Sequence, residues 1–528
     1  MSEIKSHFVF GTTAAYSHVP PIIELSISLL KTTPDLVISV LLHINNHETS
    51  LNLIDNENLS EDVKSRIKLW PVGEKRNIND MHNLFFDMIY KSGEVYAGIL
   101  LGSAPWPNPT VFIYDAASFF YVMIKSKVEE KFPHIKPTRT IAYNPVPVGE
   151  VLFLAGSEEN GSIRWLDRLL DETDPDARVK PEQNLLSGAN NNSAVDPLVQ
   201  AAWMEKFAKA YKACLFESDR TIKIPGYKPF HAFERWGTEV DYGSLQEIGW
   251  FQYLSGYQQT LPVPEQWITC YPSSVIEPET LEALKKDEYL TSSGKKPFIE
   301  LGWYERKPKQ NWGEGVKSFL DKYDAKSVVY ISFGTVVNAG PTLPALFEYL
   351  EETKTPYIYA YGNQKSTLPE NMRTILEESE KQGLCLAPDW VDQVGVLSHK
   401  SVKCFISHCG ANSTIEGIEA GVPIIAMGRK GDQVLLSSRI HDLDLGIELL
   451  QHRTGYSIGK ELTHRKGILV KGTKEALKEE LVEAFNRING PEGDEMRLKS
   501  RKLSQEIEEK RQGEWKENIQ KFGLYGRE

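Results

Sequence analysis

Short runs of β-branched and aromatic residues alternate with longer amphipathic segments along the chain, and this rhythm restricts its possible folds most strongly. Such alternation is typical of βα units, which build parallel sheets. The expected strands are residues 8–10, 35–44, 111–115, 327–333, 357–361, 402–407 and 422–427. The clearest expected helices are residues 20–30, opened by Pro20 and Pro21, and residues 473–488. The pattern predicts an α/β protein with two doubly wound domains.

The chain has 528 residues, enough for two to four domains at about 150 residues each. We expect the first domain at residues 1–302 and the second at residues 316–493. A polar segment rich in Lys, Gly, Pro and Trp, residues 303–315, is the expected linker, and residues 172–193 read as an exposed loop. Two facing domains of this type leave a cleft between them, and ligands bind at the carboxyl ends of parallel strands.

The charge balance and the cysteine content exclude several classes of protein. The formal net charge of −12 argues against a nucleic-acid or anionic-membrane binder, which needs clustered Lys and Arg. Five cysteines imply no disulfide scaffold and fit a reducing compartment. No apolar run reaches the ~18 residues of a membrane span. The apolar run at residues 8–10 is shorter than the core of a secretory leader, so a cytoplasmic protein is expected.

Polar residues in the second half cluster where strands are expected to end. Residues 402–407 lead to His408, Gly410 permits close backbone approach, and Asn412 and Ser413 open the next helix. The free N–H groups at a helix N-terminus form an anion site that suits a diphosphate.

Residues on both sides of this helix start suit the base, the ribose and the sugar of a nucleotide-sugar. Trp390 offers a flat face for a base, where stacking is worth ~1–3 kcal/mol per base. Glu416, one helical turn into the helix, can accept hydrogen bonds from ribose hydroxyls. Asp432 and Gln433, after the next strand, can bind several hydroxyls of one sugar.

The stretch from Trp390 to Gln433 resembles the nucleotide-sugar signature of the family 1 UDP-glycosyltransferases in its length of 44 residues and in the order of its landmarks. The resemblance implies a GT-B fold, in which two Rossmann-like domains face a cleft. It also implies that residues 494–528 form a helix that returns to the first domain. The implied UDP-sugar site consists of Thr335, Trp390, Val391, Gln393, His408, Gly410, Asn412, Ser413, Glu416, Asp432 and Gln433.

The resemblance implies a role for nine of these residues. Trp390 would stack on uracil, and Val391 and Gln393 would hold its edge and the ribose. His408, Asn412 and Ser413 would bind the phosphates, Glu416 the ribose diol, and Asp432 with Gln433 the sugar. The final Gln is the glucose-type pattern. Ala411 stands where the plant enzymes have Trp, and Gly431 also departs from them. The sugar subpocket is therefore expected to differ in shape from that of the plant enzymes.

Simpler interpretations compete at several of these positions. Ser413 and Glu416 also fit a plain helix capping box. Cys404, His408 and Cys409 lack a fourth ligand for zinc. The Asp-x-Asp triplets at residues 174–176 and 442–444 read as solvated surface. We therefore expect no metal and no resident cofactor, with the UDP-sugar as a co-substrate.

His18 is the strongest candidate for a general base. It precedes Pro20 in a His-x-Pro setting between the first strand and the first helix, as the catalytic histidine of the family does. An acceptor hydroxyl must lose its proton as it attacks the anomeric carbon, and imidazole titrates near working pH. Asp115, at the end of residues 111–115, is the expected orienting acid. The simpler reading of both residues is structural: a helix start for His18 and an N-cap for Asp115.

The first domain is expected to supply the acceptor pocket, and several apolar residues suggest a small lipophilic acceptor. These are Phe85, Phe86, Met88, Trp106, Phe119, Phe120 and Met123, each equally consistent with ordinary core. The leading hypothesis is an inverting transferase that moves a hexose from a UDP-sugar to a hydroxyl and forms a β-glycoside. The alternatives are a UDP-sugar epimerase and a non-catalytic nucleotide-sugar-binding protein. The acceptor's identity does not follow from the sequence.

Overall fold

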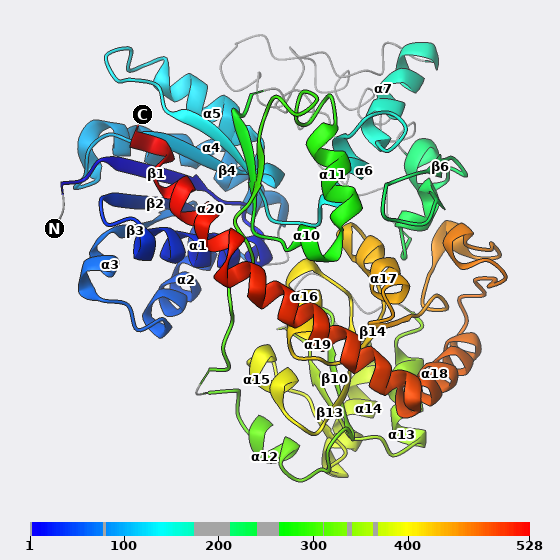
Figure 1. The fold of residues 1–528 in the computed structure, drawn as a ribbon. Coiled ribbons are helices and arrows are strands. Elements are labelled where there is room, and N and C mark those ends of the chain that lie inside the picture. Colours follow the sequence, from blue (N-terminus) through cyan, green and yellow to red (C-terminus); the bar gives the residue numbers. More distant parts are fainter. Residues whose placement is uncertain are drawn as a thin grey trace. The chain divides into compact units, whose positions relative to one another are not determined.

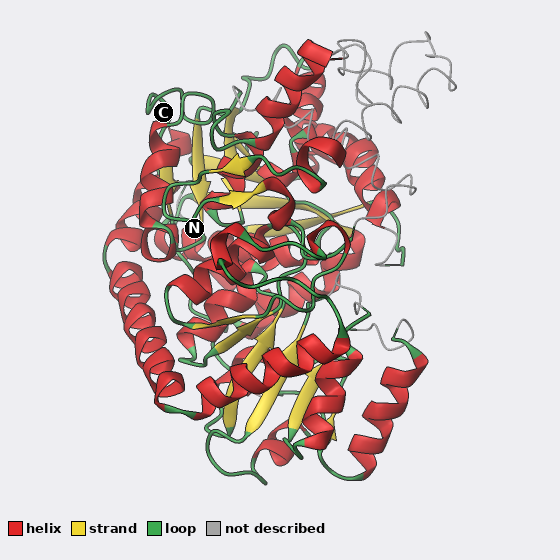
Figure 2. Ribbon diagram, turned by 90° about the vertical axis from the view of Figure 1, so that its right-hand side faces the viewer, coloured by secondary structure: helices red, strands yellow, loops and turns green. Residues whose placement is uncertain are grey.

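The computed structural model describes residues 3–77, 81–173, 212–239, 263–309, 311–334, 341–362 and 368–527. It divides the chain into two compact units. The first unit contains residues 1–214, 241–304 and 509–528, and the second contains residues 215–240 and 305–508. Figure 1 shows the elements of both units along the chain, and Figure 2 shows helices on both faces of each sheet.

The first unit is built on a seven-stranded parallel sheet with the order β3-β2-β1-β4-β5-β8-β9. Its strands are β1 (Ser6–Gly11), β2 (Leu36–His43), β3 (Ile67–Val72), β4 (Val111–Asp115), β5 (Arg139–Asn144), β8 (Gln266–Thr269) and β9 (Phe298–Glu300). The strand order reverses between β1 and β4, and such a reversal is where doubly wound sheets bind ligands.

Amphipathic helices cover this sheet, and the described helices are α1 (Val19–Thr32), α2 (Ile44–Asn56), α3 (Glu61–Ser65), α4 (Met81–Gly98), α5 (Phe120–Glu129), α6 (Val148–Ala155), α7 (Ser162–Thr173), α10 (Ser273–Ile276), α11 (Pro278–Lys286) and α20 (Glu514–Gly523). Burial on both faces makes the central strands mostly apolar: every residue of β1, β2 and β4 is buried.

The second unit holds a six-stranded parallel sheet with the order β12-β11-β10-β13-β14-β15. Its strands are β10 (Val328–Ser332), β11 (Tyr357–Ala360), β12 (Cys385–Leu386), β13 (Val402–Ser407), β14 (Ile424–Ala426) and β15 (Gly446–Glu448). Successive residues of β10 point to opposite faces, so Val329 and Ile331 enter one apolar cluster while Val328 and Tyr330 enter the other. The strand order reverses between β10 and β13.

The helices of the second unit are α12 (Val316–Leu320), α13 (Pro344–Glu352), α14 (Glu370–Lys381), α15 (Gln393–Ser398), α16 (Ala411–Glu419), α17 (Asp432–Asp442), α18 (Lys474–Asn489) and most of α19 (Pro491–Gln512), whose last residues, from Glu509 on, belong to the first unit. A small antiparallel pair, β6 (Thr221–Ile222) and β7 (Phe230–His231), also belongs to it. The predicted α/β class with two doubly wound parallel sheets is confirmed.

The predicted first domain was wrong for residues 215–240, which pack in the second unit. Glu234 is fully buried there, and a buried carboxylate requires partners. Its Oε2 lies 2.6 Å from His464 Nδ1, and its backbone carbonyl accepts from Arg453 at 2.7 Å. These partners come more than 200 positions later, so no local pattern could reveal them. The backbone N–H of Gly237 also donates to the Arg429 carbonyl.

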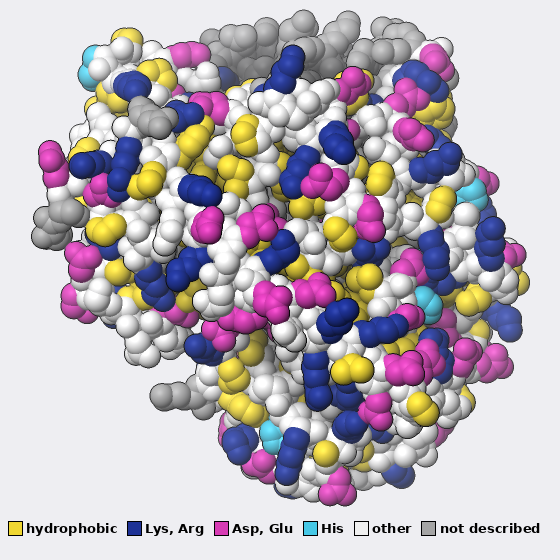
Figure 3. All heavy atoms as spheres, in the orientation of Figure 1, with side chains coloured by type: hydrophobic (Ala, Val, Ile, Leu, Met, Phe, Trp, Pro, Cys, Tyr) yellow, Lys and Arg dark blue, Asp and Glu magenta, His cyan; other side chains and the backbone are white. Residues whose placement is uncertain are grey.

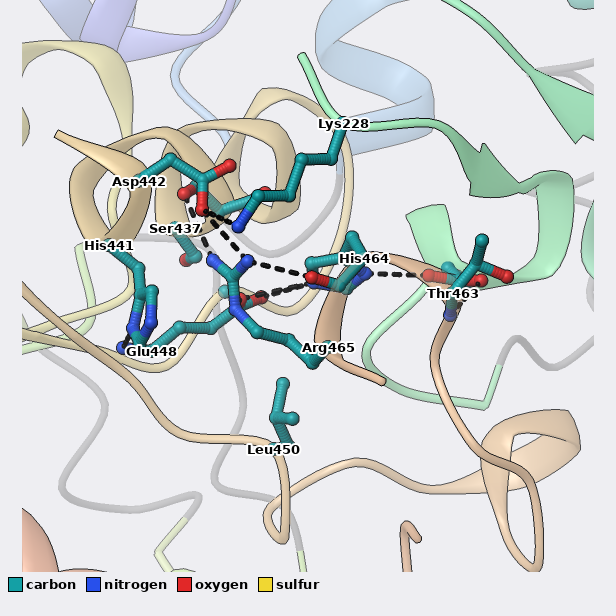
Figure 4. A network of polar contacts seen from close by, with 12 residues as sticks. Lys228, Ser437, His441, Asp442, Glu448, Leu450, Thr463, His464 and Arg465 are labelled. Carbon is teal, nitrogen blue, oxygen red and sulfur yellow. Dashed lines mark hydrogen bonds and ion pairs between the residues drawn. The ribbon is translucent and has the colours of Figure 1, made fainter. Parts of the chain in front are cut away.

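Residues 215–240 are held in the second unit by a buried ionic network (Figure 4). His464 bridges two carboxylates: its Nε2 lies 3.1 Å from Glu448 Oε2, opposite Glu234. Burial acts to lower the pKa of His464, but Glu448 and Glu234 outweigh it and raise that pKa above its usual value. Burial acts to raise the pKa of Glu448, but His464 and Arg465 outweigh it and lower that pKa. Asp442 pairs with Arg465 and Lys228, so the reading of residues 442–444 as solvated surface was wrong for Asp442.

The predicted linker and the C-terminal segment also divide between the units. Residues 303–304 belong to the first unit, whereas residues 305–315 belong to the second, where Trp312 packs against an apolar cluster. Residues 494–508 remain with the second unit, and residues 509–528 belong to the first. There Trp515 donates to Glu300 at 3.0 Å and lies so close to Gly302 that a Cβ at that position would be 2.2 Å from the indole. The predicted exposed loop at residues 172–193 lies almost entirely outside the described residues, as does the triplet at residues 174–176.

Candidate functional site

His18 and Asp115 lie on the two sides of the strand-order reversal in the first unit. The chain leaves β1 at Gly11 and reaches His18 at the end of a short 3₁₀ turn, where His18 caps α1. Pro20 and Pro21 occupy the first turn of α1, where a missing N–H costs nothing. Asp115 is the last residue of β4, which neighbours β1 in the sheet. The topology therefore brings together two residues separated by 97 positions.

The two side chains form a direct contact. His18 Nδ1 lies 2.8 Å from Asp115 Oδ2, and the side chain of Asp115 is fully buried while 18% of the His18 side chain is exposed. The other carboxylate oxygen, Oδ1, accepts from the Ala117 N–H at 2.8 Å. A carboxylate can only accept, so Nδ1 carries the proton and the basic lone pair lies on Nε2. Both simpler readings also hold, because His18 starts a helix and Asp115 caps the next turn.

The loop between β1 and His18 is fixed by hydrogen bonds with residues from three other elements. The Thr12 N–H donates to the Leu41 carbonyl at 3.0 Å, and the Tyr121 hydroxyl donates to the Thr12 carbonyl. Asn46 donates to the Ala14 carbonyl at 3.0 Å. Gly11 is required here, because a Cβ would lie 2.8 Å from the Tyr121 ring. These contacts hold the loop that carries the histidine.

Two other histidines of the first unit, His7 and His43, are buried. His7 is buried, with ring nitrogens bonded to Pro107 and Ser39, and burial lowers its pKa to about 4. His43 is buried, and its Nε2 lies 3.6 Å from Asp87. Of the apolar residues considered for the acceptor, Met88, Phe119 and Phe120 are buried in the core.

In the second unit, β13 delivers His408 to the carboxyl edge, directly before α16. Burial lowers the pKa of His408 to about 4, so the ring is neutral at pH 7 and can donate one N–H. Two glycines make room for this ring. A Cβ on Gly334 would lie 2.8 Å from His408 Nε2, and a Cβ on Gly410 would lie 2.6 Å from it.

The first turn of α16 contains Asn412 and Ser413, as predicted. Gly410 is its N-cap and supplies no side-chain oxygen, so the N-terminal N–H groups are not capped by their own N-cap side chain. The capping-box reading of Ser413 and Glu416 was wrong, because Ser413 lies inside the helix and its hydroxyl accepts from Gln393 at 3.1 Å.

Gln393 and Glu416 form the centre of a hydrogen-bonded group. Gln393 Nε2 donates to Glu416 Oε2, and the Tyr330 hydroxyl donates to Gln393 Oε1 at 2.9 Å. The second oxygen of Glu416, Oε1, accepts from Arg306 at 2.5 Å. Arg306 and Tyr330 had no role in the sequence prediction: Arg306 falls in the polar segment taken as linker, and Tyr330 reads as an ordinary strand residue.

Trp390 and Val391 behave differently although they are adjacent. Trp390 is 53% exposed, which leaves its indole accessible for stacking, and the Lys309 ammonium lies 5.0 Å from a ring centroid. The Val391 side chain is buried in an apolar cluster, so only its backbone can hold a ligand. Burial raises the pKa of the neighbouring Asp392, whose Oδ2 accepts from the Lys309 N–H at 2.6 Å.

Asp432 and Gln433 occupy the first turn of α17, after β14. Gly431 precedes them with φ +65°, a conformation that favours glycine. Gln433 Oε1 accepts from the Arg429 N–H at 3.4 Å. The Arg429 guanidinium lies 5.6 Å from the Phe333 ring centroid, and burial lowers its pKa only to about 10, so it stays charged at pH 7. Thr335 lies outside the described residues.

Metal ligands, membrane-spanning helices and surface charge bear on other classes of protein. No group of three or more His, Cys, Asp or Glu residues suited to a metal was found among the described residues. None of the helices in that part is long and apolar enough to cross a membrane. On the face in Figure 3, Lys and Arg side chains are interspersed with Asp and Glu side chains.

Comparisons with known proteins agree with this geometry. Residues 298–449 match the family described as UDP-glucoronosyl and UDP-glucosyl transferase, and this segment contains the whole stretch from Trp390 to Gln433. Residues 298–449 are therefore similar to this family, and the predicted resemblance is confirmed for this part of the chain.

Two curated relatives are similar to this chain. An anthocyanidin 3-O-glucosyltransferase from Solanum melongena is 35% identical over 182 residues, which cover 33% of this chain and 41% of the relative. An anthocyanidin 3-O-galactosyltransferase from Rhododendron delavayi is 40% identical over 160 residues, 30% of this chain and 33% of the relative. The chain thus spans less than half the length of the curated relatives it matches.

The fold comparison extends over the whole chain. A solved structure of a UDP-glucosyltransferase from Polygonum tinctorium, capable of glucosylating indoxyl, matches with a TM-score of 0.66 at 17% identity and covers 100% of both chains. This likeness shows the fold, including that of the first unit.

Proposed function

We propose that the chain is an inverting glycosyltransferase that moves a hexose from a UDP-sugar to a hydroxyl of a small lipophilic acceptor. The observation that carries the proposal is the His18–Asp115 pair, with Nδ1 and Oδ2 separated by 2.8 Å. A protein that only bound nucleotide-sugars would not need an oriented histidine in its first unit. The family match in the second unit supports a UDP-sugar as the donor.

In the proposed reaction, His18 Nε2 takes the proton of the acceptor hydroxyl. The oxygen attacks C1 of the sugar, the new C–O bond forms, and the bond from C1 to the phosphate oxygen breaks, which releases UDP. Asp115 holds the ring in the required tautomer and stabilises the imidazolium that forms. Because the displacement is single and direct, the configuration at C1 inverts and a β-glycoside results from an α-linked donor.

The second unit is proposed to hold the donor. The N-terminal N–H groups of α16 and the neutral His408 would donate to the diphosphate, and Trp390 would stack on uracil. Glu416 would accept from the ribose diol, and Asp432 and Gln433 from the sugar hydroxyls. The N–H groups of α16 and of His408 can stabilise the charge of the departing UDP, so we propose that transfer needs no metal ion.

The relatives support a hexose donor and a flavonoid-like acceptor. The two reported above are named as a glucosyltransferase and a galactosyltransferase of anthocyanidins. Gln433 follows the glucose-type pattern, so we propose glucose as the sugar. Nothing in the comparisons supports the epimerase alternative.

The test is turnover with UDP-glucose and a panel of hydroxylated aromatic acceptors, anthocyanidins included, in the presence of EDTA. We expect UDP release with formation of a glycoside. His18→Ala should abolish transfer while UDP still binds, whereas Trp390→Ala should weaken UDP binding. His134→Ala, an exposed histidine of the same unit, serves as the matched control.

Unchanged turnover in His18→Ala would remove the base assignment. UDP binding without turnover in the wild-type chain would instead support a binding protein. A requirement for Mn²⁺ would contradict the proposed metal-independent site.

A further inference from the structure

The carboxylate of Glu416 is held on both of its oxygens. Oε1 accepts from Arg306 Nη1 at 2.5 Å, and Oε2 accepts from Gln393 Nε2 at the same distance. The Tyr330 hydroxyl donates to the amide oxygen of Gln393, which leaves the amide nitrogen to face Glu416 and Ser413. The Glu416 side chain is only 9% exposed, so its orientation is set by these neighbours.

Arg306 reaches this carboxylate from outside the family signature. It lies in residues 305–309, before α12, whereas the signature begins at Trp390. The same short segment makes two more contacts with the signature: the Lys309 N–H donates to Asp392, and the Lys309 ammonium lies 5.0 Å from the Trp390 ring. Arg306 and Lys309 thus contact three residues of the signature, of which Glu416 and Trp390 belong to the proposed uridine subsite.

The geometry leaves room for a ribose. Two carboxylate oxygens offer about four lone-pair sites in total. Arg306 uses one on Oε1 and Gln393 uses one on Oε2, so each oxygen retains the capacity to accept one further hydroxyl. Two vicinal hydroxyls, the 2′-OH and 3′-OH of ribose, match this arrangement.

We propose that Arg306 is a positioning residue of the uridine subsite: it fixes the Glu416 carboxylate so that one oxygen is presented to each ribose hydroxyl. This inference rests on the proposed function, because it assumes that Glu416 binds the ribose. Arg306 contacts the carboxylate rather than the reacting atoms, so its effect appears in recognition of the diol and not in the chemical step. The guanidinium is suited to this task because its planar donors hold a carboxylate in a fixed orientation, whereas a lysine ammonium acts as a point charge.

The test compares UDP with 2′-deoxy-UDP by titration calorimetry, with both ligands measured on the full chain. A hydrogen bond to a charged group is worth enough to make wild-type binding of UDP about tenfold tighter than binding of 2′-deoxy-UDP. In Arg306→Gln we expect UDP affinity to fall about tenfold, whereas the affinity for 2′-deoxy-UDP, which keeps only the 3′-hydroxyl, should fall about threefold. The ratio of the two dissociation constants should therefore drop from about ten to about three, with kcat at saturating donor within about twofold of wild type.

Two further variants make the test specific. Arg306→Lys keeps the charge and should recover part of the ratio, and it also serves if Arg306→Gln does not fold. Arg487→Gln removes an ion pair with Glu492 elsewhere in the second unit and should leave the ratio at the wild-type value.

The outcomes separate this inference from the proposed function. A wild-type chain that binds no UDP would overturn the proposed function itself. Wild-type binding with an unchanged ratio in both Arg306 variants would overturn the positioning role alone. An equal loss of affinity for both ligands would also overturn it, because a general loss of structure or charge does not discriminate the 2′-hydroxyl.

Discussion

Replacing Asp115 by Asn should disable the base without disturbing the site's shape. Asp115 Oδ1 accepts from the Ala117 N–H at 2.8 Å, and Oδ2 faces His18 Nδ1 at 2.8 Å. In the Asp115→Asn variant, the amide oxygen must remain on the Ala117 N–H, because the amide nitrogen cannot accept. The amide nitrogen then donates toward Nδ1, the ring proton moves to Nε2, and Nε2 has no lone pair for the acceptor hydroxyl.

The expected loss follows from what this tautomer removes. A positioned base contributes about 10²–10⁴ in rate, and a comparable Asp-to-Asn change in a Ser-His-Asp triad costs about 10⁴ for the same tautomeric reason. We therefore expect kcat to fall about 10²–10⁴-fold, equivalent to ~3–5 kcal/mol in the barrier. The residues proposed to bind the donor belong to the other unit, so the dissociation constant for UDP should stay within about twofold of wild type.

The assay is steady-state release of UDP from UDP-glucose with the best acceptor of the panel, alongside calorimetric binding of UDP. Asp62→Asn is the control, since it weakens an ion pair with Arg66 in the same unit but lies on α3 and not at the end of β4. A loss in kcat of less than tenfold in Asp115→Asn, with the fold intact, would refute the argument that Asp115 sets the tautomer of His18.

Three further predictions address the donor site and the stability of each unit. Gly410→Ala places a Cβ 2.6 Å from His408 Nε2, so the ring must move, and calorimetry should show UDP binding at least tenfold weaker; unchanged affinity would mean that the ring position does not matter. Trp515→Ala removes a fully buried indole and should destabilise the first unit by ~3–5 kcal/mol in denaturant unfolding, and a cost below ~1 kcal/mol would show that α20 is only loosely attached. The raised pKa of His464 means that its ionic contribution is present below pH ~6.5 and is lost as the pH rises through the folded-state pKa, so unfolding free energy should fall over that range in the wild type and less in His464→Gln. Parallel profiles for the two chains would contradict the role given to the ion pairs of His464.

The features that the sequence could predict are those set by neighbouring residues. Strands buried on both faces read as mostly apolar runs, so the strands ending at Asp115 and Ser407 were recognisable from a few residues each. The spacing of the stretch from Trp390 to Gln433 is likewise local, and the structure brings Gln393, Ser413 and Glu416 together within it.

The features that the sequence could not predict depend on distant partners. In the sequence, Glu234 cannot be told from an exposed glutamate, because its partner His464 lies 230 positions later. Arg306 lies in a polar segment typical of a linker, yet its guanidinium pairs with Glu416. The neutral state of His408 follows from burial among Gly334 and Gly410, which only the folded second unit creates.

Proton NMR of the product formed from α-linked UDP-glucose reads the anomeric configuration, which shows whether the attack at C1 is direct. Direct attack by an oxygen that His18 deprotonates predicts a β-glycoside, with the large coupling between H1 and H2 of a diaxial pair, and no such signal from His18→Ala. An α-glycoside, or a β-glycoside formed equally fast by His18→Ala, would contradict the account.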